Sequence, residues 1–322
     1  MPITPRIAVT RTIPGQLEIP GANIDTLSDD LPKRDALLAF VPGAHIIVSM
    51  YTERIDDELL DAAGHQLRGV CNFAVGVNNI DLEACARRGV IVTNTPDAVT
   101  EGTADMAWLL TLAVARKLIE ADQYARTSAY PHRGPLGMAD FMGLDLTGRT
   151  LLIIGAGRIG FAAAMRARAW GMKILYVART RHWNFELAPL AGERVDLDDG
   201  LALADVVSIH TPLTPETTHL LNERRLGLLK PTAIIVNTSR GPVIDEQALA
   251  EALHAGKLWG AGLDVFEREP EIHPDLLTAP NTVLTPHIGS AEERFRLMMT
   301  TMVADNAKAI LKGSTPPNPV SI

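Results

Sequence analysis

The first hundred residues alternate between short apolar runs and stretches whose apolar residues recur every three or four positions. A short apolar run is typical of a strand buried on both faces, and the longer period is typical of a helix that covers it. Their alternation predicts a parallel sheet with helices on both sides. In this part of the chain we predict strands at 6–10, 44–49, 67–72 and 90–93, and helices at 55–63 and 82–88.

Two long helical patterns divide the chain. The segment Thr-Pro-Asp at 95–97 interrupts the first pattern, and 103–120 is then rich in Ala and Leu. A second long helical pattern covers 291–311. Each is long enough to cross between two domains, so we expect the part of the chain between them to be a domain inserted into the first one.

The inserted part has its own series of strands. We expect one domain at 1–98 together with 290–322, and the other at 99–289. The segment 128–143 contains two prolines and several glycines, and is expected to be an irregular arm or loop. Strands of the inserted domain are predicted at 150–154, 173–177, 206–209, 233–236, 260–264 and 283–285.

A glycine motif, Gly155-Ala-Gly-Arg-Ile-Gly160, stands between a predicted strand and a predicted helix. Gly155 permits a tight turn, Gly157 lets the backbone approach a pyrophosphate, and Gly160 lets helix and strand pack closely. The amides of Arg158 and Ile159, at the start of the helix, would face the phosphates. A turn without ligand is the alternative, but the strand and helix on either side favour dinucleotide binding. The expected fold is α/β, with a Rossmann-type coenzyme domain inserted into a smaller flavodoxin-like α/β substrate domain.

The next strand indicates which dinucleotide is bound. An NAD site usually has an acidic residue near the end of this strand, where it accepts from the ribose 2′-hydroxyl. Here the strand ends in Ala178, followed by Arg179, Thr180 and Arg181. Two guanidinium groups and a hydroxyl suit a 2′-phosphate, which favours NADP(H). Glu186 is the nearest acidic residue after the strand. A chain that folds back would bring it to this site, but its distance along the sequence argues against that contact.

Composition narrows the class of protein. The 322 residues are 47% hydrophobic and 21% charged, with a net charge of −8. This balance argues against nucleic acid or an anionic membrane as the main partner. Cys71 and Cys85 form no metal-binding motif, no metal site is predicted, and reduced cysteines are typical of a cytoplasmic protein. We find no signal peptide and no apolar stretch long enough to span a membrane.

Three ionisable residues follow predicted strands, at the edge where ligands of such sheets bind. They are Arg240, Glu269 and His287. Reduction of a 2-oxo acid needs a cation for the carboxylate, a proton donor for the developing alkoxide and an anion that orients the donor. Arginine, histidine and glutamate have this chemistry, although single residues of these types are often surface residues without a catalytic role. His210, at another strand end, is an open candidate for a coenzyme contact.

Several motifs together resemble the D-2-hydroxyacid dehydrogenase family. They occur in the family's order and cover nearly the whole chain. The motifs are 72–81, 92–97, Gly155-Ala-Gly-Arg-Ile-Gly160, Asn237-Thr-Ser-Arg-Gly241, Gly262-Leu-Asp-Val-Phe266 and Thr285-Pro-His-Ile-Gly-Ser290. The Arg-Thr-Arg segment is most similar to that of the NADPH-dependent glyoxylate and hydroxypyruvate reductases.

The resemblance implies a role for each matching residue. Arg240 matches the substrate-binding arginine, Glu269 the carboxylate that orients the histidine, and His287 the acid/base. Val75 and Gly76 match the backbone amides that hold the substrate carboxylate. Coenzyme contacts are implied for Thr103, Thr238, Asp264 and Gly289, and contacts on the adenine side for Thr211, Pro212 and Thr217.

The resemblance also implies a small anionic 2-oxo acid substrate and a homodimer. Two departures from the family bear on this: Asn78 replaces a frequent Asp, and the 128–143 arm diverges from the aromatic-rich pattern of the hydroxypyruvate reductases. Phe141 and Met142 are candidates for the dimer interface, and a loop packed on its own subunit is the alternative. Another D-2-hydroxyacid dehydrogenase, a phosphite dehydrogenase and a nucleotide-sensing corepressor-like binding protein remain alternatives.

Overall fold

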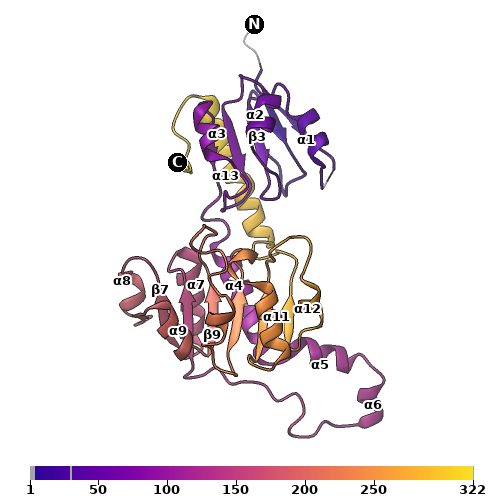
Figure 1. The fold of residues 1–322 in the computed structure, drawn as a ribbon. Coiled ribbons are helices and arrows are strands. Elements are labelled where there is room, and N and C mark those ends of the chain that lie inside the picture. Colours follow the sequence, from indigo (N-terminus) through magenta and orange to yellow (C-terminus); the bar gives the residue numbers. More distant parts are fainter. Residues whose placement is uncertain (1–3, 30, 322) are drawn as a thin grey trace. The chain divides into compact units, whose positions relative to one another are not determined.

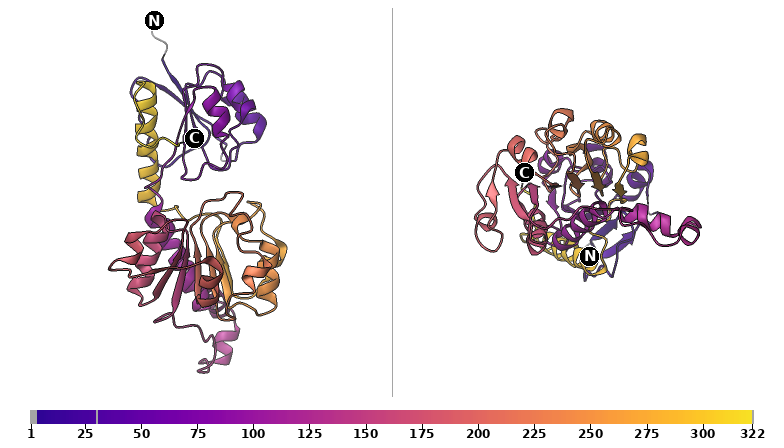
Figure 2. Two further views of the ribbon diagram at one scale, coloured as in Figure 1. Left: turned by 60° about the vertical axis from the view of Figure 1, so that its left-hand side comes forward. Right: turned by 90° about the horizontal axis from the view of Figure 1, so that it is seen from below.

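The computed structural model describes residues 4–29 and 31–321. They form two compact units, which Figures 1 and 2 show as ribbons. Unit 1 contains the residues up to Val99 and those from Ser290 onward, and unit 2 runs from Thr100 to Gly289. Unit 2 is therefore an insertion between two segments of unit 1.

Unit 1 contains a five-stranded sheet in the order β2-β1-β3-β4-β5. All neighbouring strands are parallel, with Ile7 opposite Ile46 and Val48 opposite Cys71. A parallel sheet covered on both faces buries every residue of its central strands, and all four residues of β3 are buried. The strands are β1 (Arg6–Val9), β2 (Asn23–Thr26), β3 (Ile46–Ser49), β4 (Gly69–Asn72) and β5 (Ile91–Thr93).

Four helices complete unit 1. Three leucines from the first two helices in chain order pack into one core with Ala8, Ile47 and other strand residues; they are Leu37, Leu59 and Leu60. The last helix lies against β4 and β5, where Ile310 fills the space beside Gly69. The helices are α1 (Arg34–Phe40), α2 (Asp57–Ala63), α3 (Leu82–Arg87) and α13 (Glu293–Leu311).

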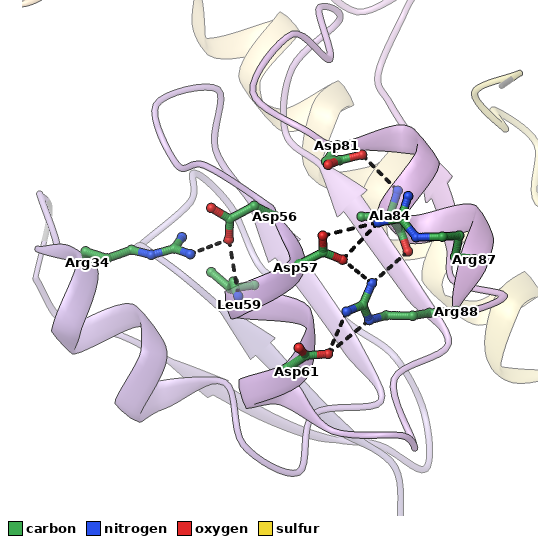
Figure 3. Close-up of polar contacts among 9 residues, drawn as sticks. All are labelled: Arg34, Asp56, Asp57, Leu59, Asp61, Asp81, Ala84, Arg87 and Arg88. Atoms are coloured by element: carbon green, nitrogen blue, oxygen red, sulfur yellow. Dashed lines mark hydrogen bonds and ion pairs between the residues drawn. The ribbon is translucent and has the colours of Figure 1, made fainter.

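Capping aspartates and arginines fix α2 and α3 on the surface of unit 1, as Figure 3 shows. Asp56 accepts a hydrogen bond from the Leu59 N–H at 3.2 Å, and Asp81 accepts one from the Ala84 N–H at 2.8 Å. Each side chain satisfies a backbone donor that has no partner within its helix. Between the helices, Arg88 bridges Asp57 and Asp61.

Unit 2 contains a seven-stranded sheet in the order β12-β11-β10-β9-β6-β7-β8. Every pairing is parallel, and β6 lies between β7 and β9, where the order of the strands reverses. In sheets of this type ligands bind at the carboxyl ends of the strands near that reversal. The strands are β6 (Thr150–Ile154), β7 (Lys173–Val177), β8 (Glu193–Arg194), β9 (Val206–Ile209), β10 (Ile234–Asn237), β11 (Gly260–Leu263) and β12 (Thr282–Leu284).

Successive strand residues of unit 2 point to opposite faces and build two cores. Leu152 and Ile154 of β6 belong to the core on one face, whereas Leu151 and Ile153 belong to the core on the other. The first core is completed by α9 (Leu197–Leu203), α10 (Glu223–Leu226), α11 (Glu246–His254) and α12 (Pro274–Thr278), and the second by α4 (Thr100–Ala115), α7 (Arg158–Ala169) and α8 (Trp183–Glu186). The α/β class and the Rossmann-type unit expected from the sequence are confirmed.

The long helix expected at 103–120 is interrupted, which corrects the sequence prediction. The helix α4 ends at Ala115, and Lys117 adopts a left-handed conformation with φ of 50°. A second helix, α5 (Leu118–Ala125), then leads into an arm that projects from the body of unit 2 in Figures 1 and 2.

The arm is more ordered than the irregular loop that the sequence predicts at 128–143. It contains α6 (Ala129–Arg133), and the Tyr124 ring packs against Tyr130 and Phe141 with centroid distances of 6.0 and 5.4 Å. Among the described residues, no helix is both long and apolar enough to cross a membrane.

Candidate active site

The glycine turn after β6 has the form that a dinucleotide needs. Gly155 has a φ of +101°, and a side chain there would also lie 2.7 Å from the His210 carbonyl carbon. A Cβ at Gly160 would lie 2.2 Å from the Gly155 oxygen, so only glycine allows this helix to pack on the turn. At Gly157, by contrast, a Cβ would meet nothing within 4 Å. This open space lies at the start of α7, where backbone amides and the helix dipole favour a phosphate.

The basic segment after β7 lies at the surface. Arg179, Thr180 and Arg181 are all exposed, while Ala178 is half-buried. The Arg181 guanidinium lies over the Trp183 ring at 4.0 Å from its centroid, and its Nε donates to Glu186 Oε2 at 2.6 Å. The chain folds back here through the short helix α8, and this brings Glu186 to Arg181, although its distance along the sequence argued against such a contact.

Glu186 is held in place by a buried phenol. The Tyr176 hydroxyl donates to Glu186 Oε1 at 2.7 Å and accepts from the His182 N–H at 2.9 Å. The hydrogen bond from Arg181, and then the one from Tyr176, lower the pKa of Glu186 below its ordinary value. The carboxylate is thus an anion at neutral pH, and it shares the site with the cations that were predicted to bind a phosphate.

A third arginine supports this segment and was missed in the sequence. Arg194, on β8, donates to the carbonyl oxygens of Ala178 and Arg179 at 2.9 to 3.1 Å. The strand β8 has only two residues, and nothing in its sequence indicated that it pairs with β7. Parallel pairing brings Arg194 to the end of β7 from about fifteen residues away, which the order of the chain does not show.

The residues predicted on the adenine side lie in the loop after β9. The Thr217 hydroxyl donates to the Pro212 carbonyl and accepts from the Thr214 N–H, both at 2.7 Å, so it shapes the loop. Thr211 follows His210, whose backbone packs against Gly155. His210 Nε2 lies 2.8 Å from the Ser208 hydroxyl, and burial lowers the pKa of this histidine to about 4. Its Nδ1 is buried and has no hydrogen-bond partner among the described residues.

Two further predicted contacts are buried beside the carboxyl ends of β10 and β11. Thr238 follows β10, and its hydroxyl oxygen is buried without a hydrogen-bond partner in the described chain. A buried polar atom of this kind is normally satisfied by a partner or a ligand. Thr103 on α4 is also buried, and its side chain lies near the position that a Cβ at Gly289 would occupy. The orphan atoms and the open glycine turn fit a dinucleotide.

Glu269 and His287 are in direct contact. The distance between Glu269 Oε2 and His287 Nδ1 is 2.7 Å, and Glu269 Oε1 accepts from the Phe266 N–H at 3.0 Å. Burial disfavours the carboxylate, but the His287 bond and charge, the Phe266 N–H and the Arg240 charge outweigh it, and the pKa of Glu269 lies below its ordinary value. Arg240 is half-buried and donates from Nη1 to the Ser239 carbonyl at 2.6 Å. The structure thus brings the three side chains proposed from the sequence into one region of unit 2.

Asp264 fixes the turn that carries His287. It is 1% exposed, and its carboxylate accepts from the Thr285 hydroxyl, the Ile288 N–H and the Gly289 N–H at 2.6, 2.9 and 2.7 Å. His287 has a φ of 55°, which few residues other than glycine adopt without such support. The sequence suggested Asp264 only as a coenzyme contact, whereas in the structure it also holds the turn that carries His287.

Val75 and Gly76 lie in unit 1, in the loop after β4. Two asparagine side chains hold their carbonyl groups: Asn94 Nδ2 donates to Val75 O, and Asn72 Nδ2 donates to Gly76 O, each at 2.8 Å. Asn72 is fully buried. These bonds fix the orientation of the peptide groups on which the predicted anion contact depends.

Comparison with known proteins identifies the family. The family model for the NAD-binding domain of D-isomer specific 2-hydroxyacid dehydrogenases matches residues 108–289. The glyoxylate reductase of Thermococcus onnurineus is 46% identical, with 98% of this chain and 96% of that protein covered. The glyoxylate reductase of Korarchaeum cryptofilum is 45% identical over the same shares.

Comparison with solved structures leads to the same family. The TT0316 protein from Thermus thermophilus has a TM-score of 0.91 at 43% identity, with 98% of this chain and 100% of that chain covered. An NADPH-dependent glyoxylate/hydroxypyruvate reductase from Sinorhizobium meliloti, in complex with NADP and malonate, has a TM-score of 0.85 at 33% identity, covering 99% and 97%. The chain belongs to the D-isomer specific 2-hydroxyacid dehydrogenase family, which confirms the resemblance seen in the motifs. It is an oxidoreductase of 2-oxo and 2-hydroxy acids with an NAD(P)-binding domain.

Proposed function

We propose that this protein is an NADPH-dependent reductase of small 2-oxo acids, with glyoxylate as its first substrate and hydroxypyruvate as its second. The observation that carries this proposal is the 2.7 Å contact between Glu269 and His287 at the carboxyl edge of the unit 2 sheet. The curated relatives at 45–46% identity are glyoxylate reductases, which supports the choice of substrate.

In this proposal His287 is the proton donor. Its Nδ1 is bound to Glu269, so Nε2 is the nitrogen that gives its proton to the carbonyl oxygen of the substrate. When bound, the reduced nicotinamide supplies the hydride that adds to the carbonyl carbon. Hydride and proton together convert the 2-oxo acid into the 2-hydroxy acid. The ionised Glu269 favours the protonated imidazole before transfer and keeps the ring in one orientation.

Arg240 would hold the substrate carboxylate. Its planar guanidinium offers two parallel donors, which suit a carboxylate better than a single ammonium does. Asn237 Nδ2 donates to the Arg240 carbonyl at 2.9 Å and so fixes the backbone from which the side chain extends. The N–H groups of Val75 and Gly76 are the further anion contacts that we propose.

Arg179, Thr180 and Arg181 would bind the 2′-phosphate of NADPH. Their exposure leaves room for a ligand, and the reductase from Sinorhizobium meliloti, which is in complex with NADP, supports this choice of coenzyme. The pyrophosphate would lie at the Gly155–Gly160 turn, against the amides of Arg158 and Ile159. The remaining proposed coenzyme contacts are Thr103, Thr211, Pro212, Thr217, Thr238, Asp264 and Gly289.

We also propose that the protein is a homodimer that uses the arm after α5. Met138 and Met142 on this arm are 97% and 67% exposed, whereas Phe141 packs against Tyr124 of its own chain. These two methionines lie four residues apart on the arm, and a second chain packed against it would cover them. Of the two interface candidates from the sequence, Met142 is therefore the better one.

A turnover assay tests the function directly. Coenzyme oxidation would be followed with glyoxylate, hydroxypyruvate, pyruvate and no substrate, each with NADPH and with NADH, and coenzyme reduction with phosphite. We expect the highest kcat/KM for glyoxylate with NADPH. Activity with phosphite alone would identify the alternative dehydrogenase, and coenzyme binding without turnover of any substrate would favour a nucleotide-sensing protein.

A further inference from the structure

Two glutamates outside the catalytic trio exchange hydrogen bonds with each other's backbone. The Glu267 N–H donates to Glu246 Oε1 at 2.6 Å, and the Glu246 N–H donates to Glu267 Oε1 at 2.9 Å. Glu246 is the first residue of α11, and Glu267 lies four residues after β11. We call this pair of bonds the glutamate clasp. It joins the start of α11 to the segment that carries Glu269.

The clasp places two like charges close together in a poorly solvated place. Glu246 is 6% exposed, and the Glu267 side chain is 24% exposed. Burial, and then the charge of Glu267, raise the pKa of Glu246, while the N–H groups of Glu267 and His273 partly oppose them. Burial of a carboxylate is unfavourable unless it is hydrogen-bonded, so these backbone contacts are what keep Glu246 in position.

The Glu246 side chain contacts the backbone close to Glu269 in the chain. The Glu267 N–H, which donates to Glu246, stands two residues before Glu269. The neighbouring Phe266 N–H donates to Glu269 itself at 3.0 Å. One buried carboxylate thus fixes the backbone two residues before Glu269, and the adjacent peptide group orients the Glu269 side chain.

The clasp is also connected to the loop that carries Arg240. A Cβ at Gly241 would lie 1.9 Å from the Phe266 carbonyl carbon, so these two backbones are in direct contact. His219 joins both segments, because its Nε2 lies 3.1 Å from Glu267 Oε1 and its N–H donates to the Pro242 carbonyl at 2.8 Å. A shift of residues 266–267 would therefore also change the base from which Arg240 extends.

We propose that Glu246 is a positioning residue of the reaction, which acts by holding Glu269 in contact with His287. The inference rests on the proposed function, because it takes the Glu269–His287 pair as the proton-donating unit. Glu246 itself touches neither residue of that pair; its effect passes through the backbone of residues 266–269. An error of about 1 Å in a catalytic group can lower the rate by about 100-fold, so this support is expected to be visible in kcat.

The first test compares three variants on α11. Glu246→Ala removes the acceptor, Glu246→Gln keeps an oxygen acceptor without the charge, and Glu251→Ala is a matched control because Glu251 is exposed on the same helix. We expect Glu246→Ala to lower kcat by about 10- to 100-fold, with little change in the Kd of NADPH, and to move the alkaline limb of the pH profile of kcat to lower pH. Glu246→Gln should restore most of kcat.

The second test asks whether Glu246 acts through Glu269. In a Glu269→Gln background, Glu246→Ala should cost much less in kcat than it does in the parent enzyme, because the contact that it supports is already impaired. Full additivity of the two changes would overturn the proposal. A Glu246→Ala variant with the kcat and pH profile of Glu251→Ala would do the same. If Glu246→Ala does not fold, Glu246→Asp, which is one methylene shorter, replaces it in each comparison.

Hydrogen exchange gives a readout that does not depend on turnover. In Glu246→Ala the amides of residues 264–273 should exchange faster, while those of β6 and β9 remain protected. Equal exchange of 264–273 in Glu246→Ala and Glu251→Ala overturns the inference even if the wild-type protein reduces none of the tested acids. If Glu246→Ala loses protection at these amides but the wild-type protein reduces none of the tested acids, the proposed function is wrong, while the structural role of the glutamate clasp stands.

Discussion

The carboxyl ends of β7 and of β10–β12 belong to one sheet but hold their charged residues in different ways. After β7, Arg179 and Arg181 are exposed, and Arg181 is held by a single carboxylate and an aromatic ring. After β11, both oxygens of Glu269 are engaged, and the turn that carries His287 is fixed by the buried Asp264. Proton transfer depends on distance and direction, whereas attraction of a phosphate tolerates movement of the cations.

This difference predicts how the two regions respond to change. Loss of a fixed group should appear mainly in kcat, and loss of an exposed cation should appear mainly in coenzyme binding and should depend on salt. The largest effects are expected in the fixed region.

His287→Ala is the strongest test of the fixed region. Because the proposed proton donor is removed, we expect kcat for glyoxylate reduction to fall by roughly 10²- to 10⁴-fold. The Kd of NADPH, measured by fluorescence titration, should change little because the coenzyme would be held at Gly157 and Arg179. His65→Ala, at an exposed histidine of unit 1, is the control. A kcat within a few-fold of the parent would exclude His287 as the donor.

Glu269→Gln tests the charge of the pair. The pKa of Glu269 lies below its ordinary value of 4.5, so the side chain is an anion throughout the neutral and alkaline range. Glutamine keeps a hydrogen-bonding side chain but loses the charge that favours the imidazolium. The pH at which reduction fails on the alkaline side should therefore fall, as a pH series of kcat would show. An unchanged alkaline limb would make Glu269 structural.

Replacing Arg179 and Arg181 together by Ala tests the exposed region. We expect the Kd of NADPH to rise by at least about tenfold, the usual worth of a charge-assisted hydrogen bond. The Kd of NADH should stay nearly constant, and kcat at saturating coenzyme should change little. Equal kcat/KM values for NADPH and NADH in the parent enzyme would contradict the proposed coenzyme preference.

The fold was largely predictable because most strands of both sheets are buried runs of apolar residues. All four residues of β9 are buried, for example, and the run 206–209 was sufficient to find it. The strand β2 was missed because it is an edge strand with the polar sequence Asn-Ile-Asp-Thr and no buried residue. The end of α4 was missed because Lys117 is an ordinary helix residue and no glycine or proline marks the turn.

The candidate site was predictable where sequence order reflects spatial order. Strand ends of a parallel sheet lie at one edge, so Arg240, Glu269 and His287 could be proposed together, although their roles came from the resemblance. The supporting contacts could not be predicted in this way. The Asp264 carboxylate reaches amides more than twenty residues away, and the Glu246–Glu267 clasp joins residues twenty-one apart. Such pairs depend on how helices and loops pack, which no local pattern records.

The contact between Glu186 and Arg181 was also not predicted from the sequence, although the two residues are only five positions apart. It leads to the smallest predicted effect. In the proposed NADPH complex the Glu186 carboxylate would compete with the 2′-phosphate for Arg181 and would repel the phosphate. Glu186→Gln removes the charge but keeps an oxygen that can accept from the Tyr176 hydroxyl. We therefore expect the Kd of NADPH to fall by about twofold to fivefold, the range of a surface ion pair, and the Kd of NADH to stay unchanged. The gain in NADPH affinity should shrink as salt is added, because exposed charges are screened.

Glu193→Gln, at an exposed residue of β8, is the matched control. Weaker binding of NADPH by Glu186→Gln would instead mean that Glu186 holds Arg181 ready for the phosphate, and the β7 end would then be preorganised much as the β11 end is.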